Sequence, residues 1–242
     1  GQFLGSPLAD LFGIDILFII AAGFCVLCGI LLLQLEETLP NPKKFKWNML
    51  SVTWNDVFEP SVRPAAAIMF LSATSSGMIF VLTPDMSGYL GIDNKGHFFG
   101  IYVLSTIFIR LFASGVSDKI GRRKTLLIGM VMMSISMIVI GFSTTPTMYT
   151  VGAVLFGITT GISSPTLFAW TADLSDIKRR GVGSGTLFIA LELGIMFGAL
   201  ITIFLYKNTL MSIPNPFMVG SSFALLACAY LIWHLKNHDS IT

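Results

Sequence analysis

The chain has few charged residues. Of its 242 residues, 12% are Asp, Glu, Lys or Arg, which is about half the fraction that a soluble domain carries. The sequence is 54% hydrophobic, and its mean hydropathy is +0.79. This composition excludes an ordinary soluble domain and predicts an all-α membrane protein, a bundle of helices that cross the bilayer. The net charge of +2 says nothing about nucleic acid, and the basic residues recur at the ends of the apolar runs instead of forming one patch, so we expect no nucleic-acid partner.

Cysteine and histidine are also scarce, with three residues of each. Cys25, Cys28 and Cys228 all lie inside apolar runs, so we interpret them as small packing residues rather than as redox or metal-binding groups. The sequence has no His-Glu-x-x-His motif and no glycine-rich phosphate loop. We therefore expect no metal, no cofactor and no enzymatic activity of this chain.

Long apolar runs are what the chain has in abundance. Each is close to the ~20 residues that cross the hydrocarbon layer. They predict seven transmembrane spans, over residues 14–35, 64–84, 97–114, 125–143, 149–171, 182–206 and 217–235. Residues 1–8 have the composition of the tail of another span. Because the chain begins at Gly1 without Met, we expect it to be a piece of a longer protein.

The distribution of positive charge predicts an orientation. Twelve of the 15 Lys and Arg residues fall on one side of the predicted spans, whereas Lys95 and Lys207 fall on the other and Arg110 lies inside a span. Cytoplasmic loops carry an excess of Lys and Arg. We therefore expect a multi-pass protein of the inner (plasma) membrane, with the basic side and the C-terminus in the cytoplasm.

The longest polar connection, residues 36–63, contains a second pattern. Large apolar residues recur in it at helical spacing after a lysine-rich stretch; they are Trp47, Leu50, Trp54, Val57 and Phe58. This pattern predicts a helix that lies along the cytoplasmic membrane surface with its aromatic residues in the headgroup region. An ordinary surface helix packed on the protein is the alternative.

Residues 114–124, SGVSDKIGRRK, form a short basic turn between two apolar runs. The turn resembles the loop signature of the major facilitator superfamily, Gly-x-Leu-(Ala/Ser)-Asp-(Arg/Lys)-x-Gly-Arg-(Arg/Lys). The matching residues are Ser117, Asp118, Lys119, Gly121, Arg122 and Arg123. Ser114 stands where the family has Gly, and Val116 where it has Leu, so small or apolar residues are kept at both positions.

The resemblance implies a domain organisation and a function. Residues 1–35 would be the end of the N-terminal half of a transporter, 36–63 the linker between the halves, and 64–242 the C-terminal six-span half. The function implied is transport of a small molecule by alternating access, with the missing N-terminal half, membrane lipid and protons as partners. Uptake of a sugar or organic acid, and a receptor or scaffold that transports nothing, are the alternatives.

The first six residues, GQFLGS, favour efflux among these possibilities. They resemble the Gly-Pro-x-x-Gly-Gly signature in the fifth span of antiporter branches of the superfamily, with Gln2 in place of Pro and Ser6 in place of the last Gly. The resemblance implies export, driven by protons.

Glu192 lies near the middle of the predicted span 182–206. An ionisable residue inside a span is a functional candidate because removing a charge from water is costly. We expect Glu192 to be buried and to bind and release the coupling proton. A neutral or paired Glu that holds helices together is the alternative.

Charged residues at the basic side predict a gate. Asp173 and Asp176 fall on the same side as the arginines of the loop signature, so we expect ion pairs that close the cytoplasmic helix ends and break when the protein opens inward. Arg110, about one turn before the loop, is expected to join this gate by pairing with Asp118 or Asp173; snorkelling to the cytoplasmic face and direct contact with the substrate are the alternatives. A solvated basic turn, set only by the orientation rule, is the alternative.

Polar stretches inside two spans predict the helices that line the substrate cavity. Small hydroxyl residues interrupt the spans 64–84 and 149–171, and Pro165 together with nearby glycines can weaken the second of these helices. The candidate cavity-lining residues are Ser72, Thr74, Ser75, Tyr102, Ser163, Ser164 and Trp170. For the aromatic members, simple packing is the alternative.

Overall fold

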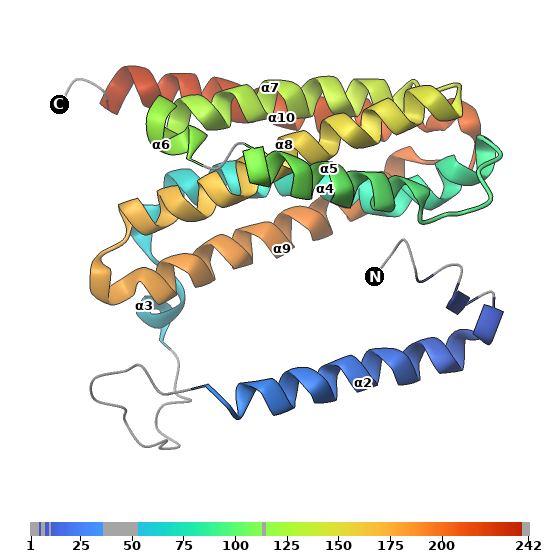
Figure 1. Cartoon of the computed structure of the whole chain (residues 1–242). Helices are drawn as coiled ribbons and strands as arrows, with labels where there is room; N and C mark the ends of the chain where they lie inside the picture. Colours follow the sequence, from blue (N-terminus) through green and yellow to red (C-terminus); the bar gives the residue numbers. More distant parts are fainter. Residues whose placement is uncertain (1–4, 6–7, 10, 36–52, 113–114, 239–242) are drawn as a thin grey trace.

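The computed structural model describes residues 5, 8–9, 11–35, 53–112 and 115–238 (Figure 1). All of the regular structure in these residues is helical. The main helices are α2 (Ile14–Leu32), α4 (Arg63–Tyr89), α5 (His97–Phe112), α7 (Arg122–Gly141), α8 (Pro146–Leu174), α9 (Arg180–Leu205) and α10 (Pro214–His238). Two short helices, α3 (Trp54–Val57) and α6 (Val116–Ile120), precede α4 and α7.

Six candidate spans are long and apolar enough to cross a membrane, and α5, with 16 residues, is a shorter apolar helix. The predicted all-α membrane bundle is therefore confirmed, with a helix at each of the seven predicted positions. The largest difference from a predicted boundary is at the end of α4. Helix α4 continues through Pro84 to Tyr89 instead of ending at residue 84. The last turn is held by tertiary packing, since Met86 is 1% exposed and Ser87 is buried, and this packing overrides the tendency of an interior proline to end a helix.

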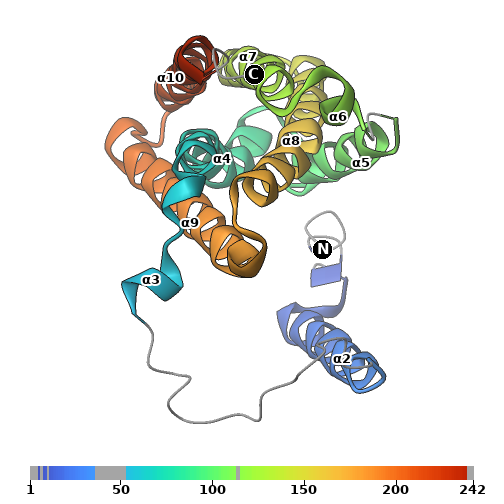
Figure 2. The same cartoon turned by 90° about the vertical axis from the view of Figure 1, so that its left-hand side faces the viewer.

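The helices from α4 onward form one bundle. Helix α4 packs along α9 and α10, α5 packs along α8, and α7 lies against both α8 and α10. Figure 2 views the bundle from the end that carries α6 and shows α4 surrounded by α8, α9 and α10. We call this the basic end, because it carries the arginines at positions 122, 123 and 179.

Glycines allow two of these helix pairs to approach closely. A Cβ atom added at Gly198 of α9 would overlap the carbonyl oxygen of Thr74 in α4, and one at Gly157 of α8 would lie 2.6 Å from the carbonyl oxygen of Tyr102 in α5. Small residues at such positions are typical of membrane helix interfaces, where backbones meet directly. The hydroxyl of Thr106 also donates to the carbonyl oxygen of Gly157 over 3.1 Å.

Apolar side chains fill the bundle in two clusters. One lies at the basic end and includes Val62, Leu126 and Leu231; the other lies toward the opposite end and includes Tyr149 and Phe217. Buried Tyr149 donates its hydroxyl to the carbonyl oxygen of Thr83 over 2.9 Å, so its polar end is satisfied.

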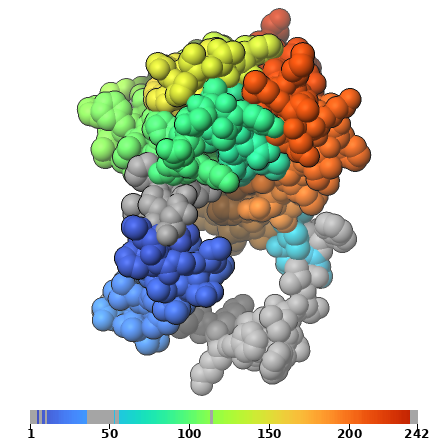
Figure 3. Space-filling model, turned by 90° about the vertical axis from the view of Figure 1, so that its right-hand side faces the viewer, coloured from blue at the N-terminus to red at the C-terminus, as the bar shows by residue number. Residues whose placement is uncertain are grey.

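Helix α2 contrasts with the bundle. None of its residues is buried, although it is the most hydropathic candidate span. Figure 1 shows it beside the bundle, and Figure 3 shows it standing apart from the body that the other helices form. A helix that is apolar all round suits contact with lipid or with other spans.

Candidate functional site

The signature loop folds into α6, and two glycines bracket this short helix. Gly115 precedes it with a φ of +79°, and Gly121 follows it with a φ of +98°. Residues with a Cβ rarely adopt these conformations. Gly121 also precedes α7 directly, so the chain turns sharply there and Ser117 and Asp118 of α6 come to lie beside Arg122 of α7.

Arg122 connects three polar side chains at the basic end. Its guanidinium pairs with Asp118, its Nε donates to Asp173 Oδ2 over 3.0 Å, and its Nη1 donates to Ser117 Oγ over 2.7 Å. One side chain thereby joins α6, α7 and α8. We call these four residues the latch. Asp173 is 55% exposed, so water competes for the pairs and each contributes about 1 kcal/mol or less.

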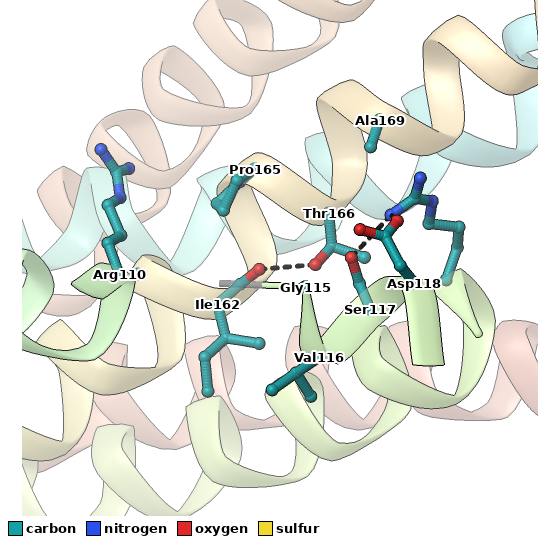
Figure 4. Close-up of a pocket in the computed structure, with 11 residues that line it drawn as sticks. Arg110, Gly115, Val116, Ser117, Asp118, Ile162, Pro165, Thr166 and Ala169 are labelled. Atoms are coloured by element: carbon teal, nitrogen blue, oxygen red, sulfur yellow. Dashed lines mark hydrogen bonds and ion pairs between the residues drawn. The ribbon is translucent and has the colours of Figure 1, made fainter. Parts of the chain in front are cut away.

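A pocket of about 400 Å³ lies between the latch and α8. Its described walls include Ser117 and Asp118 from α6, Pro165 and Thr166 from α8, and Arg110 from α5. Figure 4 shows Arg110 on the far side of the pocket from Asp118. Within the described residues, Arg110 forms no ion pair with the latch carboxylates, because Arg122 holds both. The expected pairing of Arg110 is therefore wrong in this conformation.

The remaining signature residues lie around the latch. Lys119 is exposed, and Arg123 Nη1 donates to the carbonyl oxygen of His234 over 3.5 Å. Asp176 takes no part in the latch, since its carboxylate accepts the backbone N–H of Lys178 over 2.8 Å and caps a turn. Ser114 falls outside the described residues. The gating roles of all these residues remain predictions.

A second ion pair at the basic end has no counterpart in the sequence-based predictions. Glu59, which is 7% exposed, pairs with Arg179 and accepts the hydroxyl of Ser61 over 2.9 Å. The backbone N–H of Glu59 donates to Thr186 Oγ1 of α9 over 2.9 Å, and Arg179 Nη2 donates to the carbonyl oxygen of Phe58 over 3.3 Å. These bonds anchor the segment before α4 onto the start of α9.

The hydrogen bond from Arg179, followed by that from Ser61, lowers the pKa of the Glu59 carboxyl below its usual 4.5. Glu59 is therefore ionised at neutral pH and the pair is fully formed. The only sequence signal for this anchor is a carboxylate directly before Pro60, where an apolar run begins. This signal does not identify the partner of Glu59, because Arg179 is 120 residues away in the sequence.

The middle of the bundle contains a cavity of about 410 Å³, which we call the mid-bundle cavity. Side chains from five helices line it, and they are aromatic, aliphatic or hydroxyl-bearing. The aromatic and hydroxyl residues are Phe80, Tyr102, Phe168, Phe188, Ser72, Ser76, Thr160, Ser163 and Ser164. Among its described walls there is no Asp, Glu, Lys, Arg or His. The cavity can therefore offer aromatic surface and neutral hydrogen bonds, but no counter-charge.

Four of the seven candidate cavity residues line this space, namely Ser72, Tyr102, Ser163 and Ser164. The other three lie elsewhere. Thr74 and Ser75 are fully buried; Thr74 donates to the carbonyl oxygen of Phe70 within α4, and Ser75 donates to that of Gly220 in α10. Trp170 lies at the basic end. The reason is helix geometry, because successive residues of α4 point to different sides.

Glu192 does not lie where we expected. It belongs to α9, but its side chain is exposed, and it is not among the described residues that line the mid-bundle cavity. The buried stripe of α9 includes Leu187, Gly194 and Gly198, and Glu192 projects from another side of the helix. The expectation that Glu192 is buried inside this bundle is therefore wrong. Its role in proton coupling stays a prediction.

Two further sequence predictions lie partly or wholly outside the described residues. Of the GQFLGS stretch, only Gly5 is described. Trp47 and Leu50 of the expected surface helix are not described, and the part that is described forms the four-residue helix α3. Phe58 is 36% exposed, and the Arg63 guanidinium lies 5.7 Å from its ring centroid.

Comparison with known families agrees with this architecture. The sequence model of the Major Facilitator Superfamily matches residues 65–240, which include the bundle, the latch and the mid-bundle cavity. The chain belongs to this superfamily. The predicted membership of this superfamily is therefore confirmed, and the six apolar helices long enough to cross a membrane agree with it.

Individual relatives are distant. Two proteins of Bacillus subtilis (strain 168), Multidrug resistance protein 2 and Multidrug resistance protein 1, are 23% and 25% identical over 175 and 173 residues. The alignments cover 72% and 71% of this chain, but 43% and 44% of those proteins. D-xylose-proton symporter-like 3, chloroplastic, of Arabidopsis thaliana is 26% identical over 61% of this chain and 28% of its own length. The chain thus spans less than half the length of these relatives.

Proposed function

We propose that the chain is the C-terminal half of a secondary transporter, residues 64–242, preceded by the end of the N-terminal half and the linker between the halves. The whole protein would export a small molecule by alternating access, driven by protons. Superfamily membership supports the transport mechanism, and the similarity to two multidrug resistance proteins supports export.

The mid-bundle cavity is the observation that carries this proposal. A space of about 410 Å³ is of the size that holds a small organic molecule. Its aromatic walls favour apolar or aromatic substrates, and its serine and threonine hydroxyls offer neutral hydrogen bonds. Because its described walls carry no ionised group, we expect this half to contribute shape and aromatic contact rather than charge.

The latch supplies the conformational step of the mechanism. Arg122 holds α6, α7 and α8 together at the basic end, which we propose faces the cytoplasm. Opening toward the cytoplasm would break these pairs. Their partial exposure suits this role, since water replaces the lost partners and the cost of opening stays small.

Glu192 remains our candidate for proton coupling. Its exposed position on α9 gives it no partner among the described bundle residues, so we propose that it faces the N-terminal half of the transporter. Glu192→Gln in the full-length protein should abolish proton-driven transport while leaving the protein folded. Full proton-driven flux in proteoliposomes that contain this variant would remove Glu192 from the mechanism.

Proton-coupled uptake of a sugar is the second candidate, because a relative is named as a D-xylose-proton symporter-like protein. The full-length protein in proteoliposomes separates the candidates. Under an imposed pH gradient, an exporter moves a lipophilic dye against the direction of proton flow, whereas a symporter moves sugar in the same direction. Absence of flux under every gradient and with both substrate classes would favour a receptor or scaffold instead.

A further inference from the structure

The hydroxyl groups of helix α8 differ in whether they have a hydrogen-bond partner. Thr160 and Thr166 donate to carbonyl oxygens one turn earlier in the same helix, over 2.9 and 2.7 Å. In the described part of the chain, the enclosed side-chain hydroxyls that have no partner all belong to α8; they are those of Thr159, Ser163 and Thr171. Of these, Ser163 is the one that is a described wall of the mid-bundle cavity. A buried hydroxyl without a partner is costly, so Ser163 calls for an explanation.

Other hydroxyls in the walls of this cavity have already donated their protons. Ser72 and Ser76 donate to carbonyl oxygens of α4 over 3.0 and 3.4 Å, and Thr160 donates within α8. These groups can still accept a hydrogen bond, but the proton of each is already used. Ser163, which is 4% exposed, keeps a proton that no described residue accepts.

The hydroxyl of Ser163 lies at the edge of the cavity, where α7 has no side chain. A Cβ atom added at Gly129 of α7 would overlap Ser163 Oγ. Met133 lies one turn further along α7 and is itself a wall of the cavity, and residues four apart share one side of a helix. The oxygen therefore occupies a notch that Gly129 leaves beside the cavity. A serine hydroxyl can change its direction by rotation about the Cα–Cβ bond, between staggered positions.

We infer that Ser163 is the hydrogen-bond donor that selects the ligand of the mid-bundle cavity, and that this ligand is a neutral aromatic molecule with a hydrogen-bond acceptor such as a carbonyl oxygen. The inference rests on the proposed function, in which the ligand is the substrate. After rotation of the hydroxyl from the notch toward the cavity, the acceptor would take the proton of Ser163 while the aromatic walls contact the ring. No Asp, Glu, Lys, Arg or His is among the described walls, so a charged ligand would lose its hydration without compensation.

Photolabelling of the full-length protein with benzophenone tests this role. Benzophenone is a neutral aromatic ketone that light attaches to nearby C–H groups, so mass spectrometry of the labelled peptides shows whether it occupies the cavity. Two molecules, 9-fluorenone and fluorene, then compete with it; they share a ring system, but fluorenone has a carbonyl group where fluorene has a methylene group. We expect fluorenone to compete at about tenfold lower concentration, because fluorene leaves the proton of Ser163 without a partner.

Ser163→Ala should make the two competitors equal, because the donor is gone. Ser222→Ala is the matched control, since this exposed serine of α10 is not among the described walls of the cavity and donates within its own helix. The control should keep the preference for fluorenone. The inference would be overturned by a preference that persists in Ser163→Ala, by equal competition in the unmodified protein, or by the absence of label from the cavity peptides.

Thermal unfolding separates a role in binding from a role in packing. Ser163→Ala removes no described hydrogen bond, so the unfolding temperature should stay the same or rise. Ser75→Ala removes the bond to the carbonyl oxygen of Gly220 in α10 and should lower it. An equal decrease for the two variants would show that the hydroxyl of Ser163 joins helices instead, and would overturn the assignment. Labelling with the expected preference, but without flux under any gradient, would refute the transport proposal and leave Ser163 as a ligand-binding residue.

Discussion

At the basic end, helices are joined by ion pairs between side chains, whereas along α4 and α9 they are joined by direct backbone contact at glycines. Arg122 connects three helices through partly exposed hydrogen bonds. Gly198 and Gly77 instead bring the backbone of one helix against that of the other, with no room for a Cβ atom. Water can replace the partners of an ion pair when it breaks. Two backbones that meet at a glycine, in contrast, cannot move apart without leaving a void between the helices.

This difference indicates which part of the bundle moves. Where Gly77 and Gly198 meet the facing backbone, the α4–α9 pair has no side chain that could rearrange, so we expect the pair to move as one rigid unit. The latch can break and form again at small cost, because water reaches its charges, whereas Glu59 of the second ion pair is only 7% exposed. The variants described below test this contrast between a rigid middle and a releasable end.

The largest expected effect is on the rigid middle. Gly198→Ala would place a methyl group against the carbonyl oxygen of Thr74, and such overpacking costs about 1–3 kcal/mol. Gly185→Ala is the matched control on the same helix, since a Cβ there meets open space; it should be neutral or stabilise the protein by up to about 1 kcal/mol. Thermal unfolding of the full-length protein in detergent measures both, and equal unfolding temperatures would refute the close contact.

Variants of the latch at the basic end should change the rate of transport rather than the stability of the protein. Asp173→Arg removes the partner of Arg122 Nε and places two cations side by side, so we expect turnover to fall about tenfold, or about 1.4 kcal/mol in the barrier. Arg122→Asp/Asp173→Arg restores the pair and should recover part of the activity. Lys178→Gln, at an exposed cation of the same end that has no assigned role, is the control and should transport normally. A failure of the double swap to exceed the single variant would argue against the latch.

Sequence reasoning succeeded where a property depends on the chain alone. Span positions follow from the lengths of the apolar runs, and the glycines of the signature loop follow from the turn they allow. Sequence reasoning failed where a property depends on how the helices pack against one another. Glu192 was expected to be buried, but α9 is apolar on nearly every side, so hydropathy does not indicate which face packs. Gly194 and Gly198 mark that face, because only small residues allow the approach of α4.

The anchor of Glu59 shows the same limit. A single carboxylate before an apolar run does not identify a partner 120 residues away. In the same way, the sequence placed Ser75 and Trp170 with the cavity because they are polar or aromatic inside a span. The structure shows that Ser75 donates to a carbonyl oxygen of α10 and that Trp170 lies at the basic end, beside the start of α7.

A smaller effect is expected from the mid-bundle cavity, where a variant should change substrate preference rather than the fold. Tyr102→Ala removes an aromatic wall, so we expect the affinity for aromatic substrates to fall about threefold to tenfold, or ~1 kcal/mol. Leu104→Ala, on the exposed side of the same helix, is the control. Concentration dependence of transport measures the change, and equal affinities of the two variants would exclude Tyr102 as a substrate contact.

The smallest effect should come from the Glu59 anchor and should depend on pH. The pKa of Glu59 is lowered by its bonds to Arg179 and Ser61, so the anchor contributes stability above pH 4.5 and loses it as the pH falls through the folded-state pKa. Hydrogen exchange of the amides at residues 57–59, 61 and 62 should therefore accelerate below pH 4.5, after correction for the intrinsic rate. In Glu59→Gln this step should disappear, because the amide does not titrate. If the step persists in that variant, a different carboxyl group controls the release of this segment from α9.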